Sequence, residues 1–593
     1  MSSELKVRNL KHLLEKTTFE HNNNILYNLE ERKITYNDFY EKVVALKNSL
    51  INIGLKDKKI AIISENRYEW EVTFFAVTTG VGILVPIDKT WAKNEIENVI
   101  NIAEVEAIFC SKKYEEILYE IKETNVYLKY IISFDSENEK SFNYLTKTGK
   151  DDIETQKNEL IYNNIDKEEI CLILFTSGTT FNPKAVMLSH NNICSNIINV
   201  SKIFEIDEKD IVLSVLPMNH VFEGVFGFLM SFYKGTERIF CNKIDEIIEF
   251  IHKYKITFMC GVPAIYEYLY RRREELELEK EHINMFMCGG AKLDPEMVSK
   301  YKEIGITLIQ GYGLTECSPI VSIENKKYNR KGSVGKIIPN TEIQLKDIDK
   351  DGIGELLVKG ENVTKGYFKN VEETKKNIQN EWLQTGDLVK IDEDGFVYIC
   401  GRTKNIIVLQ NGKKIFPEEI ENLLNEIKGI KESFVFGYNN KIYAKIVYDS
   451  KDFINLSEEE IYKIIKNEVK RINESLAEYK KIYNFIISNE RLEKTSIGKI
   501  KRNLELEKIN SNFKKTDEKL KNKKGKNIEK IRQIFTSTLD NNEIELDMDI
   551  NELGADSLDK VEIFLKVEKE FNIKLDTEQK RTIKSIHDVL NLL

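Results

Sequence analysis

One short segment combines the residue types that can bind a polyphosphate. The segment LFTSGTTFNPKAVMLSH, Leu174 to His190, follows an apolar strand-like run and gathers hydroxyl residues and a glycine into one turn. The turn contains Thr176, Ser177, Gly178, Thr179 and Thr180, with Lys184 nearby. Backbone amides, hydroxyls and an ammonium group can together surround a triphosphate. Because the spacing is not that of the usual P-loop, these residues alone predict only an anion-binding loop. An ordinary Ser/Thr-rich turn is the alternative.

Six further segments follow the first along the chain. They are LPMNHVFE (216–223), CGGAKL (288–293), GYGLTE (311–316), WLQTGDL (382–388), GRTKNIIVLQNGKKIFPEEIE (401–421) and KTSIGKIKR (494–502). In this order they resemble the signatures of the acyl-adenylate-forming superfamily, which includes acyl-CoA ligases, luciferases and nonribosomal adenylation domains. The resemblance covers most of the chain before residue 511. It implies that the chain uses ATP to activate a carboxylic acid as acyl-AMP.

The resemblance also assigns residues to the nucleotide. It implies that Asp387 accepts the ribose hydroxyls, that Arg402 supports the same sugar, and that Thr176 and Glu316 hold Mg²⁺, for which oxygen ligands are suitable. Taken singly, each could be a turn residue or a surface ion pair. The residues expected to bind ATP or AMP are Thr176, Ser177, Gly178, Thr179, Thr180, Lys184, Gly290, Ala291, Gly311, Tyr312, Gly313, Thr315, Asp387 and Arg402.

The reaction requires charge neutralisation, because a carboxylate must approach the α-phosphate of ATP and the two anions repel each other. Lys499, in the last segment, is the candidate cation. His220 is expected at the acid pocket by resemblance, although a lone histidine after a strand is often a hydrogen-bonded loop residue. Lys404 matches the hinge position about which the small domain rotates between adenylation and thioester formation.

Three positions depart from the family pattern. Phe181 and Ala185 replace two glycines of the first segment, and Glu493 replaces the proline expected before KTS. Since phenylalanine does not freely adopt positive φ, Phe181 predicts a phosphate loop of altered shape or weaker hold on ATP. The polar side chains expected to contact ATP are all present.

A second resemblance lies near the C-terminus. The segment LGADSLDKVEIFLKVEKEFNIKLD, 553–576, resembles acyl carrier proteins, which implies 4′-phosphopantetheine on Ser557, added by a phosphopantetheinyl transferase. Asp556 can cap a helix that begins near Leu558. The helical spacing of Leu558, Val561, Phe564 and Leu565 predicts an amphipathic helix, with Asp559, Glu562, Glu568 and Glu570 on an acidic surface. Ser557 would be a tether, since no histidine lies nearby in sequence.

The acyl substrate and acceptor follow from resemblance. SENRYEW (64–70) and LPMNHVFE are more like long-chain fatty acyl ligases than amino-acid adenylation domains, so a fatty or other apolar acid is expected. The leading interpretation is an acyl-ACP synthetase that loads its own carrier domain and feeds a downstream acyltransferase. One alternative is a fatty acyl-CoA ligase that uses free CoA, with the carrier domain serving another partner. The other is a catalytically decayed carrier or scaffold protein.

The surrounding elements predict an α/β fold with several units. A chain of 593 residues is too long for a single hydrophobic core. Its composition, 41% hydrophobic and 31% charged residues, is typical of a globular protein. Apolar runs alternate with helical patterns, which predicts a large multi-subdomain adenylating domain (1–402), a small mobile α/β lid (403–510), a lysine-rich linker (511–526) and a helical carrier bundle (527–593).

Composition also limits the partners. The net charge of −9, without a long basic stripe outside the linker, argues against nucleic acid. The eight cysteines lack the close pairs of zinc or redox sites, and the charged N-terminus does not resemble a secretory signal. No stretch is a confident transmembrane helix. We therefore expect a cytoplasmic enzyme, with peripheral membrane contact left open.

Overall fold

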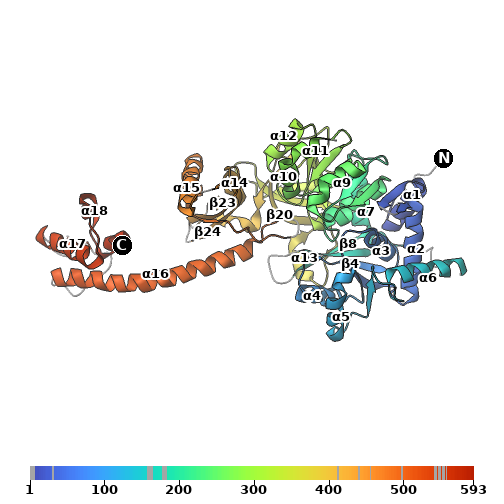
Figure 1. The fold of residues 1–593 in the computed structure, drawn as a ribbon, viewed down its shortest axis with the longest axis horizontal. Helices are drawn as coiled ribbons and strands as arrows, with labels where there is room; N and C mark the ends of the chain where they lie inside the picture. The colour runs from blue at the N-terminus through green and yellow to red at the C-terminus, as the bar shows by residue number, and fades with distance from the viewer. Residues whose placement is uncertain are drawn as a thin grey trace. The chain divides into compact units, whose positions relative to one another are not determined.

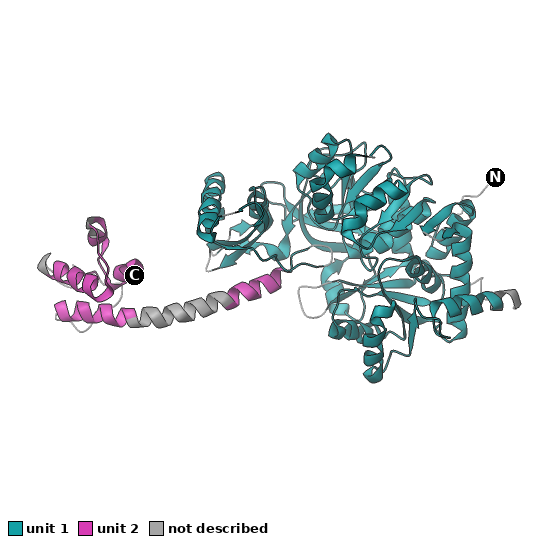
Figure 2. Ribbon diagram, viewed as in Figure 1, with its two compact units in different colours: residues 1–501 teal, residues 502–593 magenta. Residues whose placement is uncertain are grey.

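A computed structural model describes most of the chain. The described residues are 7–29, 32–155, 164–176, 183–278, 280–409, 413–438, 441–454, 456–495, 499–539, 544, 549–550, 555 and 557–593, of which 152–155, 512–526, 557–558, 577 and 581 are described by their backbone alone. The chain divides into two compact units, Met1–Lys501 and Arg502–Leu593 (Figure 2). Each unit is described separately below.

The first sheet of the larger unit is mostly parallel. Its strand order is β18-β8-β7-β4-β3-β5-β6, with antiparallel pairing only of β8 to β7 and β18 to β8 among the described strands. The strands are β3 (Lys58–Ile63), β4 (Gly82–Pro86), β5 (Ala107–Cys110), β6 (Tyr130–Ser133), β7 (Ile170–Thr176), β8 (Lys184–Ser189) and β18 (Gly366–Tyr367). Nearly continuous apolar runs form the central strands because both faces of such a sheet are covered.

The second sheet has the order β15-β14-β13-β12-β11-β9-β10-β1-β2 and is parallel from β13 to β1. Its strands are β1 (Ile25–Leu29), β2 (Arg32–Thr35), β9 (Ile211–Ser214), β10 (Glu237–Phe240), β11 (Phe258–Gly261), β12 (Met285–Cys288), β13 (Leu308–Gly313), β14 (Ile320–Ile323) and β15 (Lys336–Ile337). Ligands of open α/β sheets bind beyond the carboxyl ends of parallel strands. The predicted segments at 174–190, 216–223, 288–293 and 311–316 all lie at strand ends of these two sheets.

Helices connect and cover these strands (Figure 1). They are α1 (Leu10–Glu20), α2 (Tyr36–Asn52), α3 (Tyr68–Thr78), α4 (Lys93–Ala103), α5 (Glu115–Thr124), α6 (Phe142–Thr155), α7 (His190–Ser201), α8 (Phe228–Tyr233), α9 (Ile247–Tyr254), α10 (Pro263–Arg271), α11 (Arg273–Glu277), α12 (Pro295–Glu303) and α13 (Val371–Asn377). The apolar run before Pro86 is α3 followed by β4, and α3 is buried on every side. This apolar run is thus a buried helix that leads into a strand.

A smaller β region and the lid complete the first unit. The β region contains β16 (Thr341–Lys346), β17 (Gly354–Gly360), β19 (Ile378–Gln379), β20 (Trp382–Ile391) and β21 (Val397–Arg402). The lid contains β22 (Ile407–Val408), β23 (Lys414–Ile415), α14 (Pro417–Asn425), β24 (Ile430–Tyr438), β25 (Lys441–Tyr448), α15 (Glu458–Ser475) and β26 (Ile482–Ser488). Buried residues of α14 and α15 share one hydrophobic core with the sheet β24-β25-β26.

The second unit is helical in its described part. It contains α16 (Arg502–Leu539), α17 (Ser557–Phe571), α18 (Thr577–Thr582) and α19 (Ile586–Leu592), and residues of α16, α17 and α19 share one core. Residues 511–526, predicted as a linker, lie within α16, because Lys and Glu favour a helix. The predicted boundary at 510 therefore falls inside a helix, and the three boundaries between the four predicted parts remain predictions.

The predicted apolar face of α17 is only partly buried in the structure. Phe564 is buried together with Ile563 and Val567, whereas Val561 and Leu565 are 55% and 58% exposed. A spacing of three to four residues defines a helical face without saying which neighbour covers it. Here the core lies on the side of Ile563 and Val567, which the sequence pattern had not singled out.

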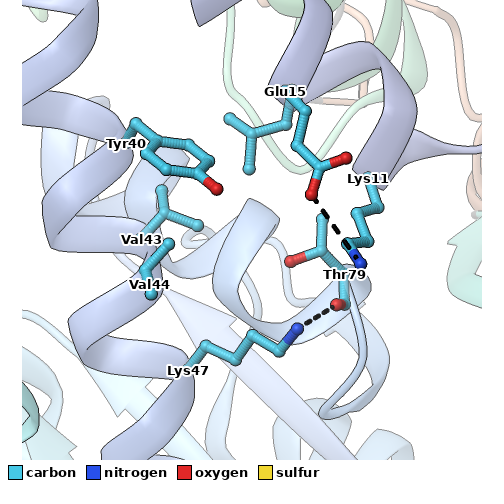
Figure 3. A pocket seen from close by; sticks show the side chains of 8 residues that line it. Lys11, Glu15, Tyr40, Val43, Val44, Lys47 and Thr79 are labelled. Atoms are coloured by element: carbon cyan, nitrogen blue, oxygen red, sulfur yellow. Dashed lines mark hydrogen bonds and ion pairs between the residues drawn. The ribbon is translucent and has the colours of Figure 1, made fainter. Parts of the chain in front are cut away.

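A shallow pocket between α1, α2 and the end of α3 lies among charged residues (Figure 3). Its volume of about 20 Å³ suits one water molecule. Lys47 Nζ donates to the carbonyl of Thr79, the C-cap of α3, at 2.8 Å, while Lys11 pairs with Glu15. Burial, and then Lys11, lower the pKa of Lys47 to about 8. A cation at a helix C-terminus is stabilising, so we assign this lysine a structural role.

The sequence expectations for fold class are confirmed. The described part of the chain is a mixed α/β unit followed by a helical unit. Seven cysteines are buried free thiols and Cys400 is half-buried. Among the described residues, no helix has both the length and the apolar character needed to cross a bilayer.

Candidate active site

The antiparallel pair β7–β8 presents the two ends of the predicted phosphate loop. Thr176 ends β7 and faces Lys184, the first residue of β8, in the strand register. The Thr176 hydroxyl donates to the Lys184 carbonyl at 3.5 Å. Ser177, Gly178, Thr179 and Thr180 lie outside the described residues, and so does Phe181. The structure therefore places Thr176 and Lys184, which flank the loop, and none of the four residues between them that are predicted to bind phosphate.

Lys184 is held by two neighbours that sequence reasoning did not select. Its ammonium forms a short ion pair with Glu373 of α13 and lies over the ring of Tyr367, 4.9 Å from the centroid. The hydroxyl of Tyr367 donates to Glu316 Oε1 at 3.0 Å. Burial, followed by Glu316, raises the pKa of that phenol. Lys184, Tyr367 and Glu316 are thus connected through one aromatic side chain.

Thr176 and Glu316 carry oxygen atoms of the kind that a hard cation prefers. Thr176 is half-buried and offers a hydroxyl, and Glu316 is half-buried and offers a carboxylate. Magnesium prefers such oxygen ligands and usually retains waters and substrate phosphates as the remaining ligands. No cluster of three or more His, Cys, Asp or Glu residues suited to a metal occurs in the described ranges. Glu316 and Thr176 could therefore hold Mg²⁺ only together with a bound phosphate.

Three predicted residues meet on β13, β20 and β21. Asp387 is opposite Arg402 in the strand register, and its Oδ1 accepts from Arg402 Nε at 2.5 Å. Asp387 Oδ2 accepts from Arg402 Nη2 at 3.2 Å and from the Tyr312 hydroxyl at 2.7 Å. The charge of Asp387 is the main cause that raises the pKa of Arg402. The Asp387 side chain is 4% exposed and that of Arg402 is 50% exposed, so a ligand can reach the pair from the arginine side.

Lys499 belongs to the same cluster. The backbone around it is fixed by hydrogen bonds from Thr495 N to Lys499 O, 2.8 Å, and from Lys499 N to Thr495 Oγ1, 3.1 Å. Lys499 is accessible to solvent, yet the surrounding protein desolvates its ammonium enough to lower its pKa, and Arg402 lowers it further. Asp387 and Glu316 act in the opposite direction. The lid residue Lys499 is therefore placed among the predicted ribose and metal residues.

His220 lies at the end of the loop after β9, and Asp88 lies after β4 of the other sheet. His220 Nε2 and Asp88 Oδ2 are 3.6 Å apart, and Asp88 accepts hydrogen bonds from the amide and hydroxyl of Thr90 at 2.9 and 2.7 Å. Burial is the main cause that lowers the pKa of His220, Asp88 opposes it, and Lys499 adds to it. The imidazole is therefore favoured in its neutral form.

A buried ionic cluster holds the helix that follows His220. The backbone amides of Glu223 and Gly224 donate to the His220 carbonyl at 3.1 and 2.8 Å, which begins the π-helical turn Phe222–Gly227. Glu223, Arg238 and Glu71 form what we call the buried triad. Arg238 Nη2 lies 2.8 Å from Glu71 Oε1 and 3.5 Å from Glu223 Oε1. The triad thus anchors the turn that presents His220.

The remaining nucleotide residues follow β12 and β13. Gly290 and Ala291 are exposed beyond β12, and Gly290 has φ +78°, which favours glycine. Gly313 ends β13, where a Cβ would lie 2.1 Å from the Pro319 carbonyl oxygen, so a side chain would force the loop apart. Gly311 and Thr315 are half-buried on either side of it.

Comparisons with known proteins agree with this arrangement. Residues 14–368 match the model of the AMP-binding enzyme family, residues 404–519 match the AMP-binding enzyme C-terminal domain, and residues 529–593 match the phosphopantetheine attachment site. The chain belongs to the AMP-binding enzyme family. It is an AMP-forming acid–thiol ligase fused to a phosphopantetheine attachment domain.

Curated relatives support this family assignment, and solved structures share the fold. A long-chain-fatty-acid–CoA ligase of Bacillus subtilis is 30% identical over 523 residues, covering 81% of this chain and 91% of that protein. The putative acyl–CoA ligase YdaB of the same species is 26% identical, with 80% and 94% covered. Among solved structures, ATP-bound MatB from Rhodopseudomonas palustris has a TM-score of 0.73 at 23% identity, covering 84% of this chain and 98% of that chain. The anthranilate CoA ligase AuaEII with anthranoyl-AMP has a TM-score of 0.73 at 21% identity, with 84% and 97% covered.

Two of the three positions at which this AMP-binding enzyme departs from the family pattern lie in the described part of the chain. Ala185 lies inside β8, 4% exposed, and its side chain belongs to a hydrophobic core, so no glycine conformation is needed there. The Glu493 carbonyl accepts from Lys501 N at 2.7 Å, which closes the segment that carries Lys499. Neither residue obstructs the Asp387–Arg402 pair.

The hinge and carrier residues are placed by their elements. Lys404 lies in the short 3₁₀ turn Thr403–Asn405 between β21 and the lid. Ser557 is the first residue of α17, and Asp556, predicted as its cap, lies outside the described residues. The predicted acidic surface of α17 is largely paired with lysines, since Glu562, Glu568 and Glu570 each lie within 3 Å of a lysine amine: Lys566, Lys580 and Lys530 at 2.7, 2.9 and 2.6 Å.

Sequence reasoning missed four residues that touch the predicted ones. Asp88 could have been suspected because it directly follows a buried strand at the sheet edge used by ligands. Glu223 was inside a recognised segment but had no assigned role. Tyr367 and Glu373 carry no signal in isolation, because only the pairing of β18 with β8 brings them to Lys184.

Proposed function

We propose that this ligase activates a fatty or other apolar carboxylic acid and transfers it to a phosphopantetheine thiol on its own Ser557. The observation that carries the proposal is the presence, in one chain, of an AMP-binding enzyme (14–368) and a phosphopantetheine attachment site (529–593). The name of the 30% identical relative, a long-chain-fatty-acid–CoA ligase, supports a fatty acid as substrate. Transfer within the chain would make the enzyme an acyl-ACP synthetase.

The first step joins the acid to the nucleotide. A carboxylate oxygen attacks the α-phosphorus of ATP, the bond to the β-phosphate oxygen breaks, and pyrophosphate leaves. Lys499 would neutralise the charge that accumulates at the α-phosphate, because it is near enough to the ribose and metal residues for Asp387 and Glu316 to act on its pKa. Thr176 and Glu316 would hold Mg²⁺ on the phosphates, where the ion offsets their negative charge.

The nucleoside would bind at the ribose side of the same cluster. Asp387 would exchange part of its hydrogen bonding with Arg402 and Tyr312 for the ribose hydroxyls. Arg402 would remain beside the sugar because half of its side chain is accessible. Gly290 and Ala291 beyond β12, and Gly311 and Gly313 of β13, would lie beside the base.

His220 is proposed as a pocket residue for the acid. Its lowered pKa keeps the imidazole neutral near pH 7, so it can donate one hydrogen bond without adding charge. Asp88 would fix the orientation of the ring. Trp70 of α3 lies 3.4 Å from the position that a Gly224 Cβ would occupy, which places an apolar side chain beside this turn. An apolar acyl group is consistent with that surrounding.

In the second step a thiolate attacks the acyl carbonyl carbon, the bond to the AMP oxygen breaks, and AMP leaves. The pantetheine arm supplies that thiol when Ser557 carries it. Ser557 is the first residue of α17, and Val561 and Leu565 expose apolar surface one and two turns later. Lys404 is the proposed hinge between the two steps.

One experiment tests acid activation and the acceptor together. Holo-protein is incubated with ATP, Mg²⁺ and a panel of carboxylic acids. The mass of the proteolytic peptide that contains Ser557 is then determined by mass spectrometry. We expect the mass of an apolar acyl group on the arm, and none in Ser557→Ala. Full acyl-CoA formation by Ser557→Ala, without acylation of wild-type protein in the presence of CoA, would instead favour the free-CoA ligase.

The free-CoA alternative has its own support, because the named relatives are CoA ligases. Competition separates the two acceptors. Holo-protein and CoA are mixed at equal concentration and both thioesters are quantified during the first turnovers. Acid-dependent exchange of pyrophosphate into ATP, if observed, would exclude a catalytically decayed scaffold.

A further inference from the structure

Glu373 occupies the position at which Lys184 would receive a phosphate. The carboxylate of Glu373 forms a short ion pair with the Lys184 ammonium, and the two side chains are only 22% and 24% exposed. The ion pair with Lys184 is also the main cause that lowers the pKa of Glu373. Because the Glu373 carboxylate and a phosphate are both negatively charged, they repel each other when both approach the Lys184 ammonium and therefore compete for it.

The placement of Glu373 is built into the fold. Strand β18 pairs with β8, so that Gly366 and Tyr367 lie opposite Met187 and Val186, and α13 begins four residues after Tyr367. Within α13, the Glu373 amide donates to Asn370 Oδ1 at 3.0 Å.

The Glu373 side chain is fixed as well. Asn377 Nδ2 donates at 2.8 Å to both the carbonyl and Oε1 of Glu373. The carboxylate therefore has one amide partner besides the lysine, and it would keep that partner when the lysine leaves.

Lys184 has a second contact that does not depend on the carboxylate. The ammonium lies over the Tyr367 ring, and the Tyr367 hydroxyl donates to Glu316. A lysine held against this ring can turn from Glu373 toward a polyphosphate without losing all of its support. The hinge residue Lys404 is near enough for Lys184 to lower its pKa and for Glu373 to oppose that effect.

We propose that Glu373 is an exchangeable counter-ion, which pairs with Lys184 when no polyphosphate is bound and is displaced from it by the phosphates of ATP. Its return to Lys184 then favours release of pyrophosphate after acyl-AMP has formed. Glu373 is a positioning residue, since it acts through Lys184 and does not contact the reacting atoms. This inference rests on the proposed function, in which Lys184 binds phosphate.

The test removes the charge of Glu373 and keeps its shape. Glu373→Gln retains an acceptor for Asn377 but no longer competes as an anion for Lys184. We expect MgATP to bind more tightly, by about two- to fivefold, which is the range for a partly exposed ion pair. The KM for ATP and the inhibition constant of pyrophosphate should fall by a similar factor, whereas kcat should not rise in proportion.

The matched control is Glu372→Gln, because Glu372 is the exposed neighbour on the same helix and the change in net charge is identical. Glu372→Gln should bind MgATP within twofold of wild type. Binding is measured by calorimetry without any acid, and the unfolding midpoint of each variant confirms that it is folded. A Glu373→Gln variant that binds MgATP no more tightly than Glu372→Gln would overturn the inference. If wild-type protein binds no MgATP, the proposed function fails instead.

Discussion

The buried triad and the Asp387–Arg402 pair use the same functional groups in opposite surroundings. Arg238 and Glu71 are 0% exposed, and Nη1 of Arg238 donates to the Gly227 carbonyl at 2.9 Å and to Ser231 Oγ at 2.6 Å. In contrast, half of the Arg402 side chain is accessible. One arginine is saturated by the protein, whereas the other remains within reach of a ligand.

The difference in exposure separates a cluster that supports the fold from one that can bind a substrate. The cost of burying Arg238 is offset only if each of its donors and both carboxylates find partners. The triad can therefore hold the turn after His220 but cannot exchange a partner for a substrate. Asp387, Arg402 and Lys499 lie where exchange is feasible, so substitutions there should change kinetics more than stability.

The largest effect is expected from Arg238→Met. The substitution leaves the carboxylates of Glu71 and Glu223 buried without their cation, which typically costs about 3–5 kcal/mol of unfolding free energy. Urea unfolding followed by circular dichroism measures this loss. A small loss, below about 1 kcal/mol, would contradict a structural role for the triad.

Arg330 offers a matched control on the surface. It lies between two carboxylates as Arg238 does, at 2.6 Å from Asp392 and 2.7 Å from Asp394, but its side chain is 40% exposed. Because water screens this pair of contacts, Arg330→Met should cost about 1 kcal/mol or less. Similar losses at Arg238 and Arg330 would show that burial does not decide the outcome.

Lys499→Ala should have the largest kinetic effect. Loss of the cation that faces the α-phosphate should lower the rate of pyrophosphate exchange by about 100-fold or more. The unfolding free energy should change little, because Lys499 is accessible and belongs to a surface segment. Lys501→Ala, two residues away, serves as the control. A variant of Lys499 that retains more than half of the exchange rate would remove this lysine from the mechanism.

Much of the fold could be predicted from apolar runs, because strands of parallel sheets are apolar on both faces. The runs at 59–63, 171–175 and 285–288 all lie in strands, and 69–78 lies in a helix. The individual residues Asp387, Arg402 and Lys499 could be named from family segments, and the structure brings them together.

Contacts between distant segments could not be predicted. Glu373 meets Lys184 across 189 residues, and Glu71 meets Arg238 across 167. Such partners are chosen by strand order and register, which leave no local pattern in either segment. The exposed positions Val561 and Leu565 show the same limit, because helical spacing gives the period of α17 but not the neighbour that covers each face.

Asp387→Asn tests the accessible Asp387–Arg402 pair and should have a smaller kinetic effect than Lys499→Ala. Asparagine keeps the size of the side chain but weakens its acceptors for the ribose hydroxyls and for Arg402, so the KM for ATP should rise about tenfold. Initial rates of pyrophosphate exchange at varied ATP measure this change. Asp392→Asn, which alters the surface partner of Arg330, should leave the KM for ATP unchanged. An equal change in both variants would show that the effect is one of net charge.

The last prediction concerns the pH dependence of stability, which distinguishes the buried triad from the accessible cluster. Burial raises the pKa of Glu223 to about 7, against the effect of Arg238. Between the ordinary glutamate pKa and 7, the folded protein holds a proton that the unfolded chain has released, so wild-type stability falls as pH rises through this window. Glu223→Gln does not titrate. Its unfolding free energy relative to wild type should therefore increase from pH 5 to 7, by about 1 kcal/mol per pH unit, and level off above pH 7.

Urea unfolding of both proteins at pH 5, 6, 7 and 8 gives this difference directly. Groups with shifted pKa values that lie away from the triad, such as His190, are present in both proteins and cancel in the comparison. Glu372→Gln, which removes a carboxylate at an exposed position, provides the control. A constant difference for Glu223→Gln would mean that Glu223 is ionised throughout, and the buried triad would then carry two negative charges against one arginine.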